Sequence, residues 1–479
     1  MSNRNNKKGG IPEWAKLGHS RPLTRREMLA AGIIPFSAKL LMPQYLGLLL
    51  GSKAHAESTE RCPVPEQGWV PFITLNLAGG AGLMANFVPH DQGGQPLPSY
   101  SLMGLGKSPS LQYEFGGVPF AGNGVANILT GIKSKALMDT VNKTAFAGVC
   151  VSLKDDTKDN KLSVDGMLVH AGRVGGILPN LGIRADTPTG MGHQPALIVP
   201  PAPLIVKDFK TIKNSLGYTA DLGTMMNENQ QKALSKMIQG LSTEQMARLG
   251  ANDAVTEVVR VVECAGMTNM NNMNNPSNTG IDPRDNMTVK NLWGITDTTK
   301  DDEEQLIFAA MTYNVLNGNA GAASLELGGY DYHNGTRTKG DKMDMDAGAL
   351  IGKILETAAT LQKPLFLYVT SDGSVASSDS DNPGAPWVWD RGSASTNYMF
   401  YYDPRGRRDL VKANDYSVGW FTKGQVADES FLTGNSAELS AVAVFANYLA
   451  VNNKLDQFGR LTNDKFSRDE LAKVVKFMA

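Results

Sequence analysis

Three polar loops of the sequence carry side chains that could hold a metal ion. Asp331 and His333 follow one predicted strand, Asp372 follows a second, and Asp390 precedes a third. Carboxylate and imidazole groups suit a divalent ion such as zinc, manganese or magnesium. Ions of this kind stabilise the attacking and leaving oxygens when an ester is displaced. We therefore expect Asp331, His333 and Asp372 to be ligands of one divalent metal, with Asp390 and Arg391 lining the site.

The elements that would position these loops are predicted from the spacing of apolar and helix-forming residues. Short β-rich segments predict strands over residues 72–77, 145–152, 195–199, 322–327, 364–370 and 397–402. Helical spacing predicts helices over residues 226–248, 251–262, 301–317, 344–362, 438–452 and 468–478, the fourth of them beginning near Asp344 or Asp346. This alternation predicts an α/β fold with a mostly parallel central sheet flanked by helices. Because ligands bind beyond the carboxyl ends of parallel strands, the three loops should meet at one edge of the sheet.

A glycine-rich turn follows the first predicted strand and should reach the same edge. It has the sequence Gly79-Gly80-Ala81-Gly82. Glycine permits positive φ angles and a close approach of the backbone to its neighbours. We therefore expect Gly79 and Gly80 to line the site.

Residues 57–479 are long enough for one large hydrophobic core, and we expect them to form a single α/β domain. An Asn- and Met-rich stretch around residues 265–290 is predicted to be a flexible insertion, with a loop over residues 267–287. Clustered methionines can bind copper(I), which is the alternative interpretation of this stretch. The turn at 379–384 begins like a calcium loop, but Pro383 occupies a ligand position, so we interpret it as a solvated acidic turn.

The motifs resemble those of a bacterial family of unknown function that is exported by the twin-arginine route. Gly328-Gly329-Tyr330-Asp331-Tyr332-His333 is similar to the Gly-Gly-Trp-Asp-x-His signature of that family. The similarity continues over residues 75–89, 369–374 and 390–400 and covers most of the chain after residue 56. The family is in turn similar to the alkaline phosphatase and sulfatase superfamily. The resemblance implies an alkaline-phosphatase-like fold and metal-dependent hydrolysis of phosphate or sulfate esters.

The sequence departs from this family at two expected ligand positions. Gly82 replaces an Asp of the family's glycine turn, and Arg391 replaces the His of its Asp-His-Gly motif. A guanidinium group cannot ligate a metal, because it is always protonated and has no free acceptor. We therefore expect Arg391 to lie close to at least one predicted ligand. A single-metal site is one alternative, and an inactive site in which Arg391 pairs with Asp390 or Asp372 is the other.

The middle Ser-His-Phe motif of the family has no clear counterpart in this sequence. Ser163, Asp165 and His170 lie in the corresponding region. With two ligands replaced, the metal site is predicted to be degenerate, and the protein to be a non-catalytic ligand- or partner-binding protein. The alternative is a divalent-metal-dependent hydrolase of phosphate or sulfate esters.

The first 56 residues have the layout of an export signal. Arg25 and Arg26 precede a moderately apolar run over residues 29–51, and Ala54-His55-Ala56 has small residues where a signal peptidase cleaves. The paired arginines predict the twin-arginine export machinery as a partner and the periplasm as the destination. An uncleaved membrane anchor is the alternative, although the run is interrupted by polar residues and prolines.

Charge and cysteine content limit the remaining possibilities. Residues 1–56 contain nine of the 46 Lys and Arg and two of the 47 Asp and Glu, so the rest of the chain has a charge of about −8. Nucleic acids and anionic membranes attract basic surfaces, so neither is expected as a partner, nor is a stable membrane span after cleavage. Among Cys62, Cys150 and Cys264 one disulfide is possible in an oxidising compartment. Cys150 lies in an apolar run and is expected to be a buried thiol, which favours Cys62–Cys264.

Overall fold

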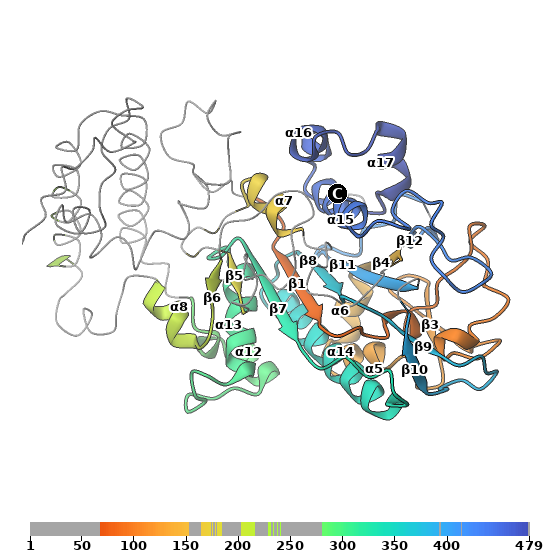
Figure 1. Cartoon of the computed structure of the whole chain (residues 1–479). Helices are drawn as coiled ribbons and strands as arrows, with labels where there is room; N and C mark the ends of the chain where they lie inside the picture. Colours follow the sequence, from red (N-terminus) through yellow and green to blue (C-terminus); the bar gives the residue numbers. More distant parts are fainter. Residues whose placement is uncertain are drawn as a thin grey trace, which may run out of the picture.

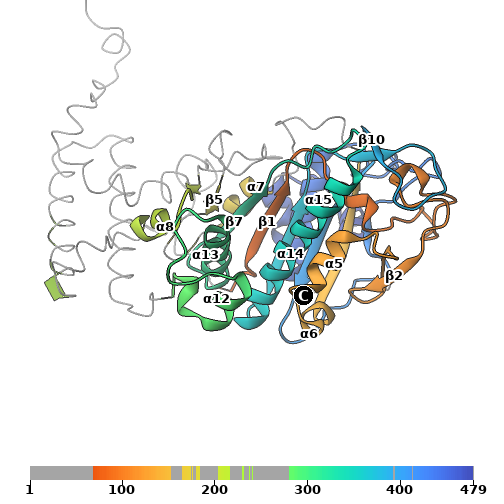
Figure 2. The same ribbon diagram turned by 90° about the horizontal axis from the view of Figure 1, so that it is seen from below.

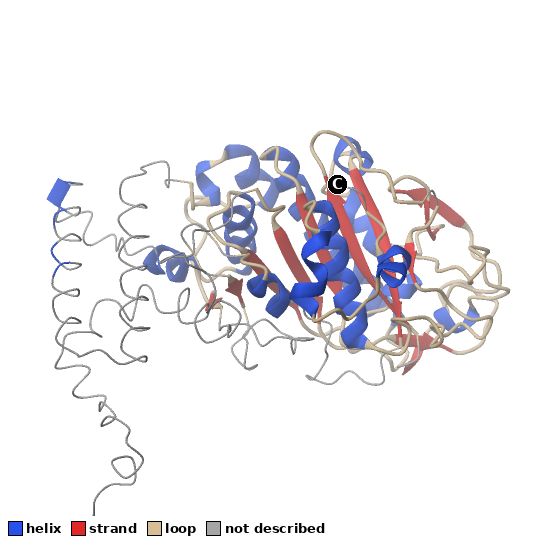
Figure 3. Ribbon diagram, turned by 90° about the horizontal axis from the view of Figure 1, so that it is seen from above, coloured by secondary structure: helices blue, strands red, loops and turns tan. Residues whose placement is uncertain are grey.

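The computed structural model of the protein describes residues 68–152, 164–173, 180–183, 203–215 and 280–477, except positions 392, 393 and 413, together with single positions between 175 and 240. Within these residues the protein has three layers, in which helices cover both faces of a twisted central sheet (Figure 1, Figure 3). Two small antiparallel ribbons, β2–β3 and β9–β10, accompany the sheet. Among the described residues, none of the helices is both long and apolar enough to cross a membrane.

The central sheet combines a parallel block with one strand of opposite direction. Its strands, in spatial order, are β12 (Ser417–Val418), β4 (Thr144–Val151), β11 (Ser395–Tyr402), β8 (Leu365–Thr370), β1 (Phe72–Leu77), β7 (Ala322–Leu327), β5 (Leu181–Gly182) and β6 (Leu204–Ile205). All neighbouring pairs are parallel except those of β11, which is antiparallel to both β8 and β4. The ribbons pair β2 (Leu111–Glu114) with β3 (Val118–Ala121) and β9 (Val375–Ser377) with β10 (Trp387–Asp390).

The two faces of the sheet are covered by different helices because successive strand residues point to opposite sides. In β1, Ile73 and Leu75 belong to one hydrophobic cluster and Phe72 to another. Figure 2 shows the helices of the first face, which are α5 (Asn127–Lys133), α6 (Met138–Asn142), α12 (Met287–Trp293), α13 (Glu304–Leu316) and α14 (Arg337–Thr360). The second face is covered by α7 (Asp165–His170), α15 (Ala437–Val451), α16 (Phe458–Thr462) and α17 (Arg468–Val474).

Helices α5 and α14 approach each other very closely because glycines lie at their contact. A Cβ atom added to Gly131 would lie 2.2 Å from the carbonyl oxygen of Met345. One added to Gly348 would lie 2.0 Å from the carbonyl oxygen of Ile128. Any side chain at either position would therefore force the two helices apart.

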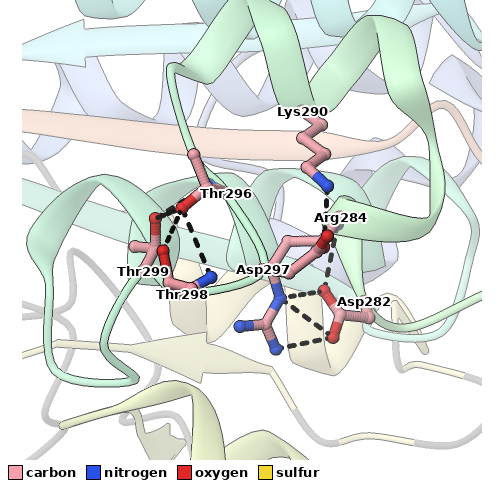
Figure 4. A network of polar contacts seen from close by, with 7 residues as sticks. All are labelled: Asp282, Arg284, Lys290, Thr296, Asp297, Thr298 and Thr299. Atoms are coloured by element: carbon pink, nitrogen blue, oxygen red, sulfur yellow. Dashed lines mark hydrogen bonds and ion pairs between the residues drawn. The ribbon is translucent and has the colours of Figure 1, made fainter.

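The segment before α13 is fixed by a polar network (Figure 4). Arg284 donates from Nε and Nη2 to the two carboxylate oxygens of Asp282, at 2.9 and 2.7 Å. Its guanidinium also lies 5.0 Å from the ring centroid of Phe209, in helix α8 (Phe209–Ser215). Lys290, in α12, pairs with Asp297 at 2.7 Å. The end of the predicted insertion, residues 283–290, is therefore not a loop, because it forms the 3-10 helix η5 (Pro283–Asp285) and the start of α12.

Most elements predicted within the described residues are present. The predicted strands near 72, 145, 322, 364 and 397 are all strands of the sheet, and a mostly parallel α/β sheet is confirmed. Residues 195–199 and 251–262, nearly all of 226–248, and residues 265–279 lie outside the described residues, as do the export signal, Cys62 and Cys264. Cys150 is a buried free thiol, as predicted, and burial raises its pKa to about 12.

Candidate metal centre

The direction of β11 brings the predicted loops to one edge of the sheet. β7 and β8 run parallel to β1, so the chain leaves both strands at the same edge. β11 is antiparallel to β8, so the chain enters β11 at this edge instead of leaving it. The residues before β11, including Asp390 at the end of β10, therefore lie at the edge where β7 leads into Asp331 and His333.

Asp331, His333 and Asp390 form a compact group with the chemistry of a metal site. Each offers one ligand atom, and these atoms all lie within 4.8 Å of one another. His333 Nδ1 contacts Asp331 Oδ1 and lies 3.1 Å from Asp390 Oδ1. The exposed side-chain fractions are 58% for Asp331, 27% for His333 and 46% for Asp390, so the group is open to solvent on one side.

The imidazole of His333 lies between the two carboxylates without a normal hydrogen bond to either. Its Nδ1 atom is buried and has no hydrogen-bond partner, although both carboxylate oxygens are within ion-pair distance. A buried polar atom without a partner is costly, and each such atom requires an explanation. A cation coordinated by the nitrogen and the two oxygens would supply the missing partner. The residues therefore fit one divalent ion held by one nitrogen and two oxygen ligands.

Asp372 was expected to be the third ligand, whereas the compact group of possible ligands contains Asp390. The Asp372 carboxylate accepts a hydrogen bond from the backbone N–H of Gly79 at 2.7 Å, and it is not part of the compact group. Asp372 thus holds the glycine turn that follows β1. The sequence could not distinguish the two acids, because both loops reach this edge and only the tertiary packing directs the Asp372 carboxylate to Gly79 and Asp390 to His333.

The glycine turn is packed against both other loops. Gly79 and Gly80 have φ angles of +116° and +97°, a region that side-chain-bearing residues rarely adopt. A Cβ atom at Gly79 would lie 2.7 Å from the backbone nitrogen of Asp331, and one at Gly80 would lie 3.2 Å from that of Ser374. Only glycine permits this approach, so the turn fixes the backbone from which Asp331 extends.

Gly82, where the family has an acid, packs against the β9–β10 ribbon. A Cβ atom at Gly82 would lie 3.1 Å from Val375 Cγ2 and 3.2 Å from the ring of Trp387. The Trp387 ring is buried and also contacts the guanidinium of Arg337 at 4.0 Å from its centroid. A side chain at this position would need Val375 and Trp387 to shift by a few tenths of an ångström, and glycine itself offers no metal ligand.

Arg391 does not form the expected ion pair. Its Nη2 donates to the carbonyl oxygen of Gly424 at 3.0 Å, and among the described residues no carboxylate pairs with its guanidinium. Its Nη1 is buried without a hydrogen-bond partner, and burial lowers its pKa from the ordinary value. The side chain is directed to the loop near Gly424, so Arg391 does not neutralise Asp390 or Asp372.

A buried carboxylate, Asp344, holds the loop that carries Asp331 and His333. This role was not predicted from the sequence. Asp344 accepts hydrogen bonds from the Tyr332 hydroxyl at 2.9 Å and from Asn86 Nδ2 at 2.8 Å. The Tyr332 oxygen in turn accepts from the N–H of Gly82 at 3.0 Å. Asp344 is 2% exposed, and burial raises its pKa to about 6 despite the opposing effect of these hydrogen bonds. Because Tyr332 lies between Asp331 and His333, this network fixes the loop that carries both ligands.

The hydroxyl groups next to the edge are already bound to the backbone. Ser371 Oγ donates to the carbonyl of Leu77 at 2.7 Å and accepts from the N–H of Ala81 at 2.8 Å. Ser374 Oγ donates to the carbonyl of Ala394. Both side chains are buried, with exposed fractions of 0% and 2%. Neither serine is available as a nucleophile in this arrangement.

The region considered for the missing middle motif lies elsewhere. Asp165 and His170 are in α7, whose apolar residues pack with the cluster on the second face of the sheet, and neither belongs to the compact metal-ligand group. Ser163 lies outside the described residues. No protein-family model and no curated protein sequence matches the chain.

Proposed function

We propose that the protein is an exported α/β protein, similar to alkaline phosphatases and sulfatases, that binds one divalent metal ion through Asp331, His333 and Asp390. In this proposal it binds a ligand or partner at the metal and does not hydrolyse esters. The observation that carries the proposal is the convergence of one imidazole nitrogen and two carboxylate oxygens, whose atoms all lie within 4.8 Å of one another. Three protein ligands leave at least one coordination position for an exogenous ligand.

Two features favour binding over hydrolysis. A second metal would need further ligands, yet Gly82 has no side chain and Arg391 is a cation. The nearby hydroxyls of Ser371 and Ser374 donate hydrogen bonds to backbone carbonyls. Neither is therefore placed to act as the nucleophile that forms a covalent intermediate. We infer that the domain retains the metal-binding edge and lacks the machinery for ester displacement.

The ligand set also favours particular metals. One imidazole and two carboxylates suit zinc or manganese, whereas magnesium prefers oxygen ligands and retains several waters. We therefore expect zinc or manganese to bind more tightly than magnesium. The open side of the group would admit water, an anion or a carboxylate of a partner as a further ligand.

A titration of chelator-treated protein with zinc and manganese tests this proposal. We expect one metal ion per chain, with binding weakened at least tenfold in Asp331→Asn and Asp390→Asn, because each removes an anionic ligand. Asp372→Asn and the exposed Asp302→Asn are matched controls and should bind almost normally. Equal binding by all four variants would refute the assigned ligand set.

Hydrolysis remains a distinct alternative, because catalytic zinc sites also combine three protein ligands with an open position. The metal-loaded protein should be inert towards p-nitrophenyl phosphate and p-nitrophenyl sulfate. Turnover that is lost in Asp390→Asn and retained in Asp302→Asn would establish the hydrolase instead. The export part of the proposal is tested separately with Arg25→Lys/Arg26→Lys, which should leave the protein in the cytoplasm.

A further inference from the structure

A cavity lies on the face of the sheet that is covered by α12, α13 and α14. It has a volume of about 400 Å³ and opens between α12, α13 and α14 at the end of β7, elements that lie together in Figure 2. Its walls include the apolar side chains of Trp293, Phe308, Leu327 and Met343. None of the metal-binding side chains lines it. Pockets of this size with an apolar wall and a few polar groups are typical of small-molecule sites.

One end of this cavity carries positive charge without a counter-ion. Lys353 is half-buried in the wall formed by α14, and Lys135 lies beside it. The Lys353 ammonium donates to the carbonyl oxygen of Trp293 at a long 3.5 Å and lies 5.4 Å from its ring centroid. Among the described residues no carboxylate forms an ion pair with it. Burial, and then the charge of Lys135, lower the pKa of Lys353.

The part of the cavity near Asp346 carries the opposite charge. Glu304 also belongs to the wall, and among the described residues neither acid forms an ion pair with Lys353. Asp346 precedes Lys353 by seven residues on α14, which corresponds to about 10 Å along the helix axis. A partly buried ammonium is stabilised by an anion nearby, whereas Asp346 disfavours a second anion beside it. The charges therefore favour one orientation of a bound ligand, with its anionic group near Lys353.

We propose that this cavity binds an amphipathic small molecule with a single anionic head group. The head group lies between Lys353 and Lys135, and an apolar body of about 10 Å extends along Trp293, Phe308 and Leu327 towards Asp346. A carboxylate or a phosphate or sulfate ester satisfies the charge requirement equally. The cavity contains none of the three proposed metal ligands, although Tyr330 in its wall directly precedes Asp331.

Octanoate is a suitable probe because it has one carboxylate and a chain of similar length, and octanol and octylamine are its neutral and cationic counterparts. Binding is measured by calorimetry on the full protein, with a chelator present so that the metal centre does not contribute. We expect octanoate to bind at least tenfold more tightly than octanol or octylamine. In Lys353→Met, which keeps the apolar stem, octanoate should lose this advantage.

Two further variants make the result decisive. Lys342→Met removes an exposed lysine from the same helix and should bind octanoate like the unaltered protein. Ala349→Trp fills the cavity from α14 and should abolish binding of all three probes while the protein remains folded. The proposal is overturned if octanoate and octanol bind equally, if none of the probes binds, or if Lys353→Met and Lys342→Met give the same affinity.

Discussion

The buried carboxylate of Asp344 predicts a specific pH dependence of stability. Its pKa is raised from 3.8 to about 6 in the folded protein, mainly by burial. A folded-state pKa above the unfolded value means that the folded protein binds the proton more tightly. The resulting stabilisation is complete below the unfolded pKa and is lost as the pH rises through the folded pKa. The full change corresponds to about 3 kcal/mol.

Asp344→Asn removes this proton-binding group and keeps nearly the same shape. The free energy of unfolding is measured in urea for both proteins, and their difference is followed with pH. Relative to the variant, the unaltered protein should lose about 2 kcal/mol between about pH 4.5 and 7.5. Asp346→Asn, an exposed acid on the same helix, reports the effect of changing the charge count alone. A difference between the unaltered protein and Asp344→Asn that stays constant over this range would refute the reasoning.

Three further substitutions have expected effects on unfolding free energy and metal affinity. Gly79→Ala should cost about 3 kcal/mol and weaken metal binding, because its Cβ clashes with the backbone of Asp331; Gly68→Ala has a similar φ and open space around it, and should cost only about 1 kcal/mol. Asn447→Ala should cost about 2 to 4 kcal/mol in urea unfolding, since its amide bonds the carbonyl of Ala443 and three buried backbone groups near the C-terminus. Ser467→Ala should cost about 1 kcal/mol, because it removes a capping box from α17, and an equal stability of this variant would exclude that role.

The strands were predictable because their residues carry the pattern of a buried sheet. Residues 364–370 are a short apolar run and residues 322–327 are mostly apolar, and both form strands of the parallel block. Strand direction is a different matter, because it depends on how the chain crosses between strands. Nothing in the residues of β11 specifies that it runs against its neighbours. The approach of Asp390 to His333 depends on this direction, because an antiparallel β11 begins at the edge where β7 and β8 end.

Helix α14 shows a second limit of local patterns. The helix was expected to begin near Asp344 or Asp346, because acids favour the first turn of a helix. It begins at Arg337 instead. The first two turns are polar and partly exposed, so they lack the apolar stripe from which a helix is predicted. Asp344 therefore lies inside the helix and points to the buried hydroxyl of Tyr332, a contact that only the tertiary packing can reveal.

The position of β1 in the sheet has a consequence for how the protein folds during synthesis. β1 is made first among the strands, but its two neighbours are β7 and β8, and Phe72 pairs with Ala322 and Phe366. At about 5 to 20 residues per second, the ribosome needs roughly 10 to 50 s to make the first of these partners. During that time a strand with one wholly apolar face, formed by Ile73, Leu75 and Leu77, has no neighbouring strand and is prone to aggregation. The domain can complete its core only after most of the chain has been released, so its N-terminal half requires protection in the cell until then.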